Sequence, residues 1–297
     1  MNGVPFLPNT LKTVCIMLGP YRNLTTLTAS IAFLHPECQV LNHAMDRVFA
    51  DESRNFISTC SEKAFHDFIS YALSISDSGE RGDHGGSITF SHAFDSVLLR
   101  DAYAARFGTS LMKKEITCFF WKESLRMANV LKENHADFEK IFLLNPKIKF
   151  LLPIRDPLDT AISNMKTKHH KLFKTISEYS LTTVLNAILS EIAWFLDLES
   201  KYPRRFLSFL QNEFHPAFLD KLASFLEISE DSLWRKQAMD CYVMKPSYPR
   251  DETLLQHLKA GLEEKLPEHP EMIEKIFRLA SSSGLDSLAC RIDVRYG

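Results

Sequence analysis

Residues 12–26 read KTVCIMLGPYRNLTT, an apolar run that ends in a glycine–proline turn and leads into a helical pattern. The run at 12–18 is short and almost uninterrupted, which is typical of a strand buried on both faces. Gly19-Pro20 marks a turn directly after it. Apolar residues then recur at helical spacing over 24–34, and His35-Pro36 ends the pattern. The stretch therefore predicts a strand, a turn and a helix in immediate succession.

The same alternation continues along the chain. Residues 147–154 (KIKFLLPI) predict a second buried strand, which enters Arg155-Asp156-Pro157 and then a helix. Further strands are predicted at 39–42, 110–113 and 206–210, and helices at 61–73, 93–107, 122–135 and 177–198. Strands that alternate with helices favour an α/β fold with a mostly parallel sheet and helices on both faces. Because no repeat or composition break divides the chain, we expect a single domain over residues 1–297.

Composition limits which ligands the protein can attract by its overall charge and in which cellular compartment we expect it. The 297 residues are 45% hydrophobic and carry a formal net charge of −2, so no overall field attracts nucleic acid or an anionic membrane. The six cysteines contain no CxxC pair, which fits a reducing compartment. The first apolar run is too short for a signal peptide, and no stretch is expected to reach the roughly 18 apolar residues of a membrane span. We therefore expect a cytoplasmic protein that binds any anionic ligand at a local site.

The loop after the first strand has the chemistry of a phosphate cradle. A helix N-terminus presents free backbone N–H groups and the positive end of the helix dipole. Thr25 and Thr26 add hydroxyl donors, and Arg22 adds a fixed cation. A threonine pair at a helix start also serves as an ordinary cap. No Gly-Lys-Ser or Gly-Lys-Thr step is present, so a kinase on a P-loop scaffold is the weaker alternative.

The second candidate segment is FLLPIRDPLDTAIS at residues 150–163. Arg155 ends the predicted strand, Asp156 can cap the helix that follows, and Pro157 suits its first position. Ser163 lies about two helical turns beyond Arg155. A plain strand–turn–helix with a surface arginine would give the same pattern.

Together the two segments resemble the paired signatures of sulfotransferases that use 3′-phosphoadenosine-5′-phosphosulfate (PAPS). Arg22, Thr25 and Thr26 match the element that holds the 5′-phosphosulfate, and Arg155 with Ser163 match the element that holds the 3′-phosphate. The resemblance covers roughly residues 12–230. It implies a three-layer, P-loop-like sulfotransferase fold and transfer of a sulfuryl group to a hydroxyl or amine.

The resemblance also implies roles within the first loop. Backbone amides from Asn23 and Leu24 through the threonines would bind the donor, and Arg22 would neutralise charge on the leaving oxygen. The family usually has glycine where Leu24 stands. This departure keeps open a third possibility, a nucleotide-binding homologue with impaired catalysis.

The general base is predicted from a family pattern in which a histidine or glutamate follows a mid-chain strand, commonly two residues beyond a lysine. Lys113 and Glu115 follow the strand predicted at 110–113, so Glu115 is the candidate base and Lys113 a candidate contact to the transferring group. Alternatively, the lysines and the glutamate are charged residues at an exposed strand end, which would account for the pattern almost as well. His92 and His84, beside the glycine-rich segment 74–87, are second choices.

Other ligands and contacts are less constrained. No metal site is predicted, and the His169-His170 pair is interpreted as a solvated surface. Arg250 is either a late contact to the 3′-phosphate or part of an ordinary proline-rich connection. The acceptor is expected to be a small molecule or a carbohydrate, with no nucleic acid or membrane partner. The sequence carries no signal for the oligomeric state.

Overall fold

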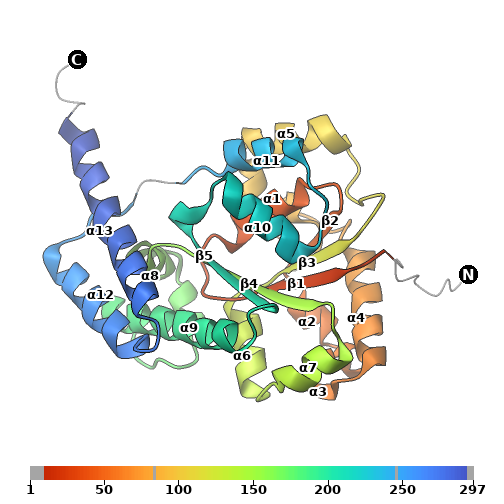
Figure 1. Cartoon of the computed structure of the whole chain (residues 1–297), viewed down its shortest axis with the longest axis horizontal. Coiled ribbons are helices and arrows are strands. Elements are labelled where there is room, and N and C mark those ends of the chain that lie inside the picture. The colour runs from red at the N-terminus through yellow and green to blue at the C-terminus, as the bar shows by residue number, and fades with distance from the viewer. Residues whose placement is uncertain (1–9, 83–84, 245–246, 293–297) are drawn as a thin grey trace, which may run out of the picture. The chain divides into compact units, whose positions relative to one another are not determined.

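The computed structural model describes residues 10–82, 85–244 and 247–292, and its centre is a five-stranded sheet with the order β2-β3-β1-β4-β5 (Figure 1). β1 pairs in parallel with both β3 and β4, and β2 pairs in parallel with β3. The predicted α/β class with a mostly parallel sheet is confirmed. The strands are β1 (Thr13–Met17), β2 (Cys38–Asn42), β3 (Cys118–Lys122), β4 (Ile148–Ile154) and β5 (Phe206–Leu210).

Burial explains why these runs form strands. Every residue of β1, β3, β4 and β5 is buried, as expected for strands covered on both faces. In the register, Thr13 lies beside Cys118 and Val14 beside Ile148. Because the strands run in parallel, their carboxyl ends meet at one edge of the sheet, which is where open α/β folds bind ligands.

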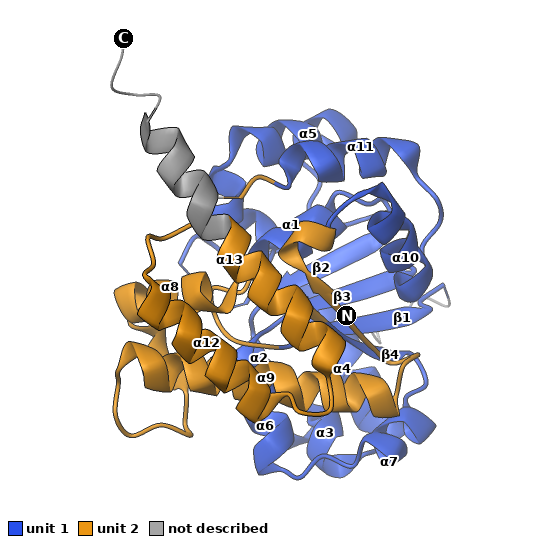
Figure 2. Cartoon of the chain, turned by 60° about the vertical axis from the view of Figure 1, so that its left-hand side comes forward, with its two compact units in different colours: residues 1–18, 25–151, 214–242 blue, residues 19–24, 152–213, 243–297 orange. Residues whose placement is uncertain are grey.

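The chain divides into two compact units whose segments alternate along the sequence (Figure 2). Unit 1 comprises residues 1–18, 25–151 and 214–242, and unit 2 comprises residues 19–24, 152–213 and 243–297. β4 belongs to both, because its first four residues lie in unit 1 and its last three in unit 2. No single cut in the sequence separates the units, and the expectation of one domain stays a prediction.

Unit 1 has helices on both faces of its strands. On one face, the Phe68 ring of α4 packs against Phe119 and Trp121 of β3. In the other layer, Trp234 of α11 donates from Nε1 to the carbonyl oxygen of Ile31 in α1 at 2.9 Å. Figure 1 shows the two helical layers. Its helices are α1 (Thr25–Phe33), α2 (Met45–Val48), α3 (Phe56–Thr59), α4 (Glu62–Ile75), α5 (Val97–Phe107), α6 (Leu125–Glu133), α7 (Phe138–Leu144), α10 (Pro216–Leu226) and α11 (Ser232–Cys241).

Unit 2 is built around a long apolar helix, α9 (Leu181–Lys201). It packs against α8 (Pro157–Thr167), α12 (Glu252–Lys265) and β5, and α13 (Pro270–Ile292) packs on α8 and α12. By length and mean hydropathy α9 could cross a membrane, although its sequence mixes polar and charged residues with the apolar ones. However, 56% of its most apolar 18-residue window is buried within the protein, and this packing accounts for its composition.

One predicted strand is misplaced. Residues 110–113 contain no strand, and the mid-chain strand is β3, whose residues CFFWK begin five positions after the end of the predicted strand. Residues 118–121 form the more apolar run and are fully buried, whereas Ser110 is exposed. The helix predicted at 93–107 is also interrupted, because Ser96 has an extended backbone and α5 begins at Val97.

Candidate anion-binding site

The loop at residues 19–24 follows β1 and has an unusual backbone. Gly19 has a φ of 101°, a backbone conformation that favours glycine, and a Cβ there would also lie 2.2 Å from Cδ1 of Leu152. Arg22 and Leu24 also have positive φ values, 64° and 62°. Leu24 thus adopts a left-handed conformation that favours glycine and that has an energetic cost for leucine.

Asparagine side chains fasten this loop to neighbouring elements of unit 2. Asn23 is buried, its Oδ1 accepts from the backbone N–H of Arg155 at 2.8 Å, and its Nδ2 donates to the carbonyl oxygen of Pro153. Asn164 of α8 donates to the carbonyl oxygen of Tyr21 at 2.7 Å. The sequence predicted a donor contact only through the backbone of Asn23 and missed the role of its side chain, which ties the loop to the end of β4.

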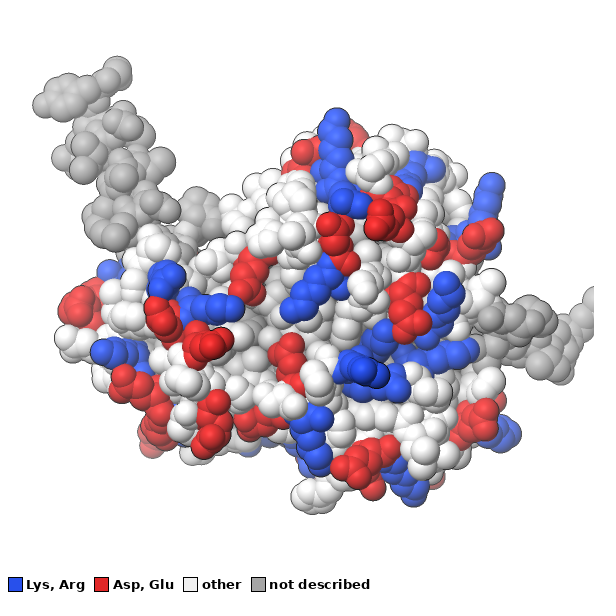
Figure 3. All heavy atoms as spheres, in the orientation of Figure 1, with Lys and Arg blue, Asp and Glu red and all other residues white. Residues whose placement is uncertain are grey.

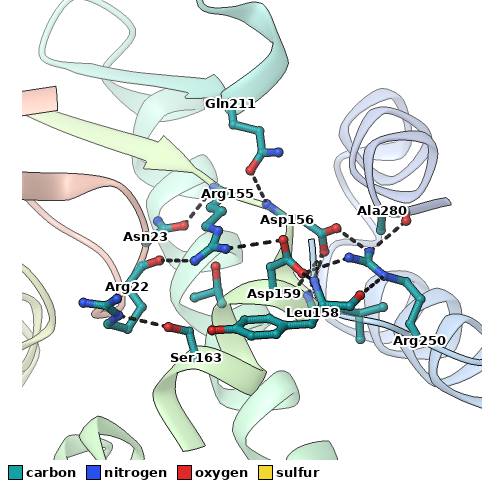
Figure 4. Close-up of polar contacts among 12 residues, drawn as sticks. Arg22, Asn23, Arg155, Asp156, Leu158, Asp159, Ser163, Gln211, Arg250 and Ala280 are labelled. Carbon is teal, nitrogen blue, oxygen red and sulfur yellow. Dashed lines mark hydrogen bonds and ion pairs between the residues drawn. The ribbon is translucent and has the colours of Figure 1, made fainter. Parts of the chain in front are cut away.

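The structure brings three of the predicted donor-site residues together (Figure 4). Nε of Arg22 donates to Oγ of Ser163 at 3.0 Å, and Nη1 of Arg155 lies 3.4 Å from the carbonyl oxygen of Arg22. Ser163 is only 2% exposed. Two segments far apart in the sequence therefore contribute to one polar cluster in unit 2.

The charges of this cluster favour an anion. Partial burial, followed by the positive charge of Arg155, lowers the pKa of Arg22 from its ordinary value. Among the described residues, Nε of Arg155 is buried without a hydrogen-bond partner. Two neighbouring guanidinium groups repel each other, and an anion with several oxygens would relieve that repulsion and accept from both.

The start of α8 sets the position of Arg155. Asp156 caps the helix by accepting from the N–H of Leu158 at 2.9 Å, and Pro157 is its first residue, as predicted. The N–H of Asp156 donates to Oε1 of Gln211 at 3.1 Å. Arg250 pairs with Asp156 and Asp159, so its guanidinium is directed to carboxylates.

The two threonines lie where the sequence placed them. Thr25 and Thr26 are the first residues of α1, directly after the loop along the chain. Thr25 is buried, and the carbonyl oxygen of Thr26 accepts from Oγ of Ser30 at 2.8 Å. Their hydroxyls and N–H groups belong to the first turn of the helix, where free backbone donors are found.

Lys113 and Glu115 do not follow the mid-chain strand, so the premise of their predicted roles is wrong. They precede β3, and the N–H of Lys113 donates to Oε1 of Gln39 near the start of β2, at the amino edge of the sheet. Nζ of Lys113 lies 3.1 Å from the ring centre of Phe107, and burial lowers the pKa of the lysine to about 6. Glu115 is exposed.

A different ionisable cluster of unit 1 occupies the carboxyl ends of β2 and β3. Nε2 of His43, the residue after β2, lies 2.7 Å from Nζ of Lys122 at the end of β3. Nδ1 of the same ring is 3.5 Å from Oε2 of Glu123, which is fully buried. Burial lowers the pKa of Lys122 to about 8. The WKES stretch at 121–124 was the sequence signal for this cluster, once the strand is placed correctly.

The predicted histidines have varied surroundings. His92 is exposed, and His84 lies outside the described residues. His170 is buried and contacts the Tyr179 ring edge-on, so the interpretation of its pair as a solvated surface is wrong for this residue. His169 stacks on Tyr21 with ring centres 4.9 Å apart.

Comparisons with known proteins identify similar structures and no similar sequences. No family model matches the chain, and no curated protein matches it. The sulfotransferase domain of the olefin synthase from Synechococcus PCC 7002 is 12% identical, with 85% of each chain covered and a TM-score of 0.42. A sulfotransferase from Mycobacterium avium is 10% identical over 90% of this chain and 77% of that one, with a TM-score of 0.42. A sulfotransferase from Alicyclobacillus acidocaldarius is 15% identical over 92% of this chain and 99% of that one, also with a TM-score of 0.42.

Proposed function

We propose that this chain is a PAPS-dependent sulfotransferase that moves a sulfuryl group by in-line transfer to a hydroxyl, or an amine, of a small-molecule or carbohydrate acceptor. The observation that carries the proposal is the gathering of Arg22, Arg155 and Ser163 in one positively charged cluster, in which Arg155 and Ser163 are buried. PAPS carries anionic groups on both its 3′ and 5′ oxygens. It therefore needs two sets of donors, and the two sequence motifs supply them.

The roles follow the motifs. Arg155 and Ser163 would bind the 3′-phosphate, and the N–H groups and hydroxyls of Thr25 and Thr26 would bind the 5′-phosphosulfate. Arg22 would offset negative charge that develops on the leaving oxygen as the S–O bond breaks. None of these roles requires a metal ion.

We propose His43 as the general base in place of Glu115. Glu123 lies beside Nδ1 of the imidazole and would hold a proton on that nitrogen, so Nε2 is left as the proton acceptor. Lys122 contacts Nε2 in this structure and would yield that position to the acceptor hydroxyl. The His43 side chain is 24% exposed, whereas Glu123 is fully enclosed, which favours the histidine as the group that meets a substrate.

Calorimetric titration without metal tests the donor site. We compare 3′-phosphoadenosine-5′-phosphate (PAP) with AMP, which lacks the 3′-phosphate, on wild type, Arg155→Ala and the exposed control Arg204→Ala. Wild type and the control should prefer PAP. Arg155→Ala should bind PAP about 10- to 100-fold more weakly and lose the preference, because a charge-assisted contact contributes about 1.5–3 kcal/mol.

Two results would contradict the proposed function and favour another one. Binding of ATP–magnesium with no binding of PAP would favour the kinase. PAP binding without sulfated product, over a broad panel of phenols, alcohols, sugars and amines, would favour a nucleotide-binding protein that lacks turnover.

A further inference from the structure

A third arginine lies behind the proposed 3′-phosphate site and is almost fully enclosed. The side chain of Arg250, which precedes α12, is only 2% exposed. Its Nη1 pairs with Asp156 and donates to the carbonyl oxygen of Ala280 at 2.8 Å, and its Nη2 donates to Oδ1 of Asp159 at 2.8 Å (Figure 4). All of these residues belong to unit 2. A guanidinium with this many fixed partners is held in one orientation.

Asp159 links Arg250 to Arg155. Its Oδ1 accepts from Arg250 and from the backbone N–H of Tyr248 at 2.9 Å, while its Oδ2 lies 3.4 Å from Nη2 of Arg155. Because one carboxylate oxygen is already bound by two close donors, only the other faces Arg155. Arg155 thus makes a single long contact with Asp159, where an Arg–carboxylate pair often makes two short ones.

The balance of charge depends on this arrangement. The group holds three guanidinium groups, those of Arg22, Arg155 and Arg250, and two carboxylates, those of Asp156 and Asp159, so one positive charge is left over. Without Arg250, Asp159 would be free to pair closely with Arg155 and cancel its charge. The second carboxylate would then repel a bound phosphate.

We propose that Arg250 is a positioning residue for Arg155: it neutralises Asp156 and Asp159 and so keeps the Arg155 guanidinium available to the 3′-phosphate. This inference rests on the proposed function. It adds a residue that does not touch the donor and acts through Asp159 on the residue that does.

Titrations with PAP and AMP on four forms of the protein test the proposal. The forms are wild type, Arg250→Lys, Arg250→Met, and Arg250→Met combined with Asp159→Asn. Arg250→Met should weaken PAP binding about tenfold or more and leave AMP binding almost unchanged. Arg250→Lys keeps the charge and should keep the preference for PAP. The double variant removes one positive and one negative charge together, so it should regain most of the preference.

The double variant separates positioning from simple structural support. If Arg250 only stabilised the fold, losing Asp159 as well would not restore PAP binding, and failure to restore it would overturn the proposal. A folded Arg250→Met that keeps the wild-type preference would do the same. If Arg250→Met does not fold, the double variant decides, because the proposal requires it to prefer PAP. A wild type that does not prefer PAP would overturn the proposed function, and this inference with it.

Discussion

Leu24 occupies a backbone conformation that suits glycine, and this makes a prediction about stability. The left-handed region costs a non-glycine residue about 1–2 kcal/mol, because its Cβ approaches the backbone. We therefore expect Leu24→Gly to be more stable than Leu24→Ala by about 1 kcal/mol, measured as the free energy of unfolding in urea.

A second leucine provides the control. Leu255, also half-buried, lies inside α12, where glycine is about 1 kcal/mol less favourable than alanine. The difference between the glycine and alanine variants should therefore have opposite signs at positions 24 and 255. The same sign at both would show that the loop is not strained at Leu24.

His43 carries the prediction for catalysis. With an acceptor that the wild type sulfates, His43→Gln should lower kcat about 100- to 10,000-fold, the usual contribution of a general base. The Kd for PAP should stay the same, because His43 is proposed to accept a proton from the acceptor and not to bind the donor.

Glu115→Gln is the matched comparison for His43→Gln. Glu115 is exposed and precedes β3, so its variant should keep wild-type turnover. Loss of turnover in Glu115→Gln, with normal turnover in His43→Gln, would restore the sequence-based assignment of the base.

At the scale of elements, the sequence predicted strands well where an apolar run stood alone. Residues 206–210 form β5 with the predicted bounds, and 147–154 match β4 within one residue. The mid-chain strand was predicted at 110–113 instead of 118–122, and Lys122, its last residue, was assigned to the following helix. Over four or five residues an apolar pattern does not separate a strand from a helix or a loop, and burial in the sheet makes the choice.

In the candidate site, too, the sequence identified some residues and missed others. Arg22, Arg155 and Ser163 belong to recognisable motifs, so the sequence could name them and the structure brings them together. The contact between Asn23 and Arg155 joins residues 132 positions apart, and the pair of Arg250 and Asp159 spans 91 positions. Neither pair follows from local spacing, because only the packing of unit 2 makes these residues neighbours.

At the scale of the whole molecule, positive and negative charges nearly balance, with 35 lysines and arginines against 37 aspartates and glutamates. On the face shown in Figure 3, lysine and arginine side chains are interspersed with aspartate and glutamate. The formal net charge is −2, so the overall field does not attract an anionic donor. Attraction must come from the local surplus of positive charge at Arg22 and Arg155, which is why removal of a single arginine is expected to have a large effect on binding.

The sharing of β4 between the two units leads to the last prediction. Residues 148–151 pair with β1 inside unit 1, and residues 152–154 continue the same strand into unit 2. Loss of either unit would leave part of a buried strand without its partners, at the cost of exposing apolar surface and unpaired backbone groups. We therefore expect both units to unfold in one cooperative transition.

Tryptophan fluorescence can follow unit 1 alone. Trp121 and Trp234 lie in unit 1 and are buried, and Trp194 lies on α9 in unit 2. In Trp194→Phe the fluorescence reports unit 1, while far-UV circular dichroism also reports the helices of unit 2. The two urea transitions should coincide, and the wild type serves as the control for the effect of the substitution on the midpoint. A dichroism signal that falls before the fluorescence would mean that β4 does not couple the units, and that unit 2 opens on its own with Arg155 and Ser163 in it.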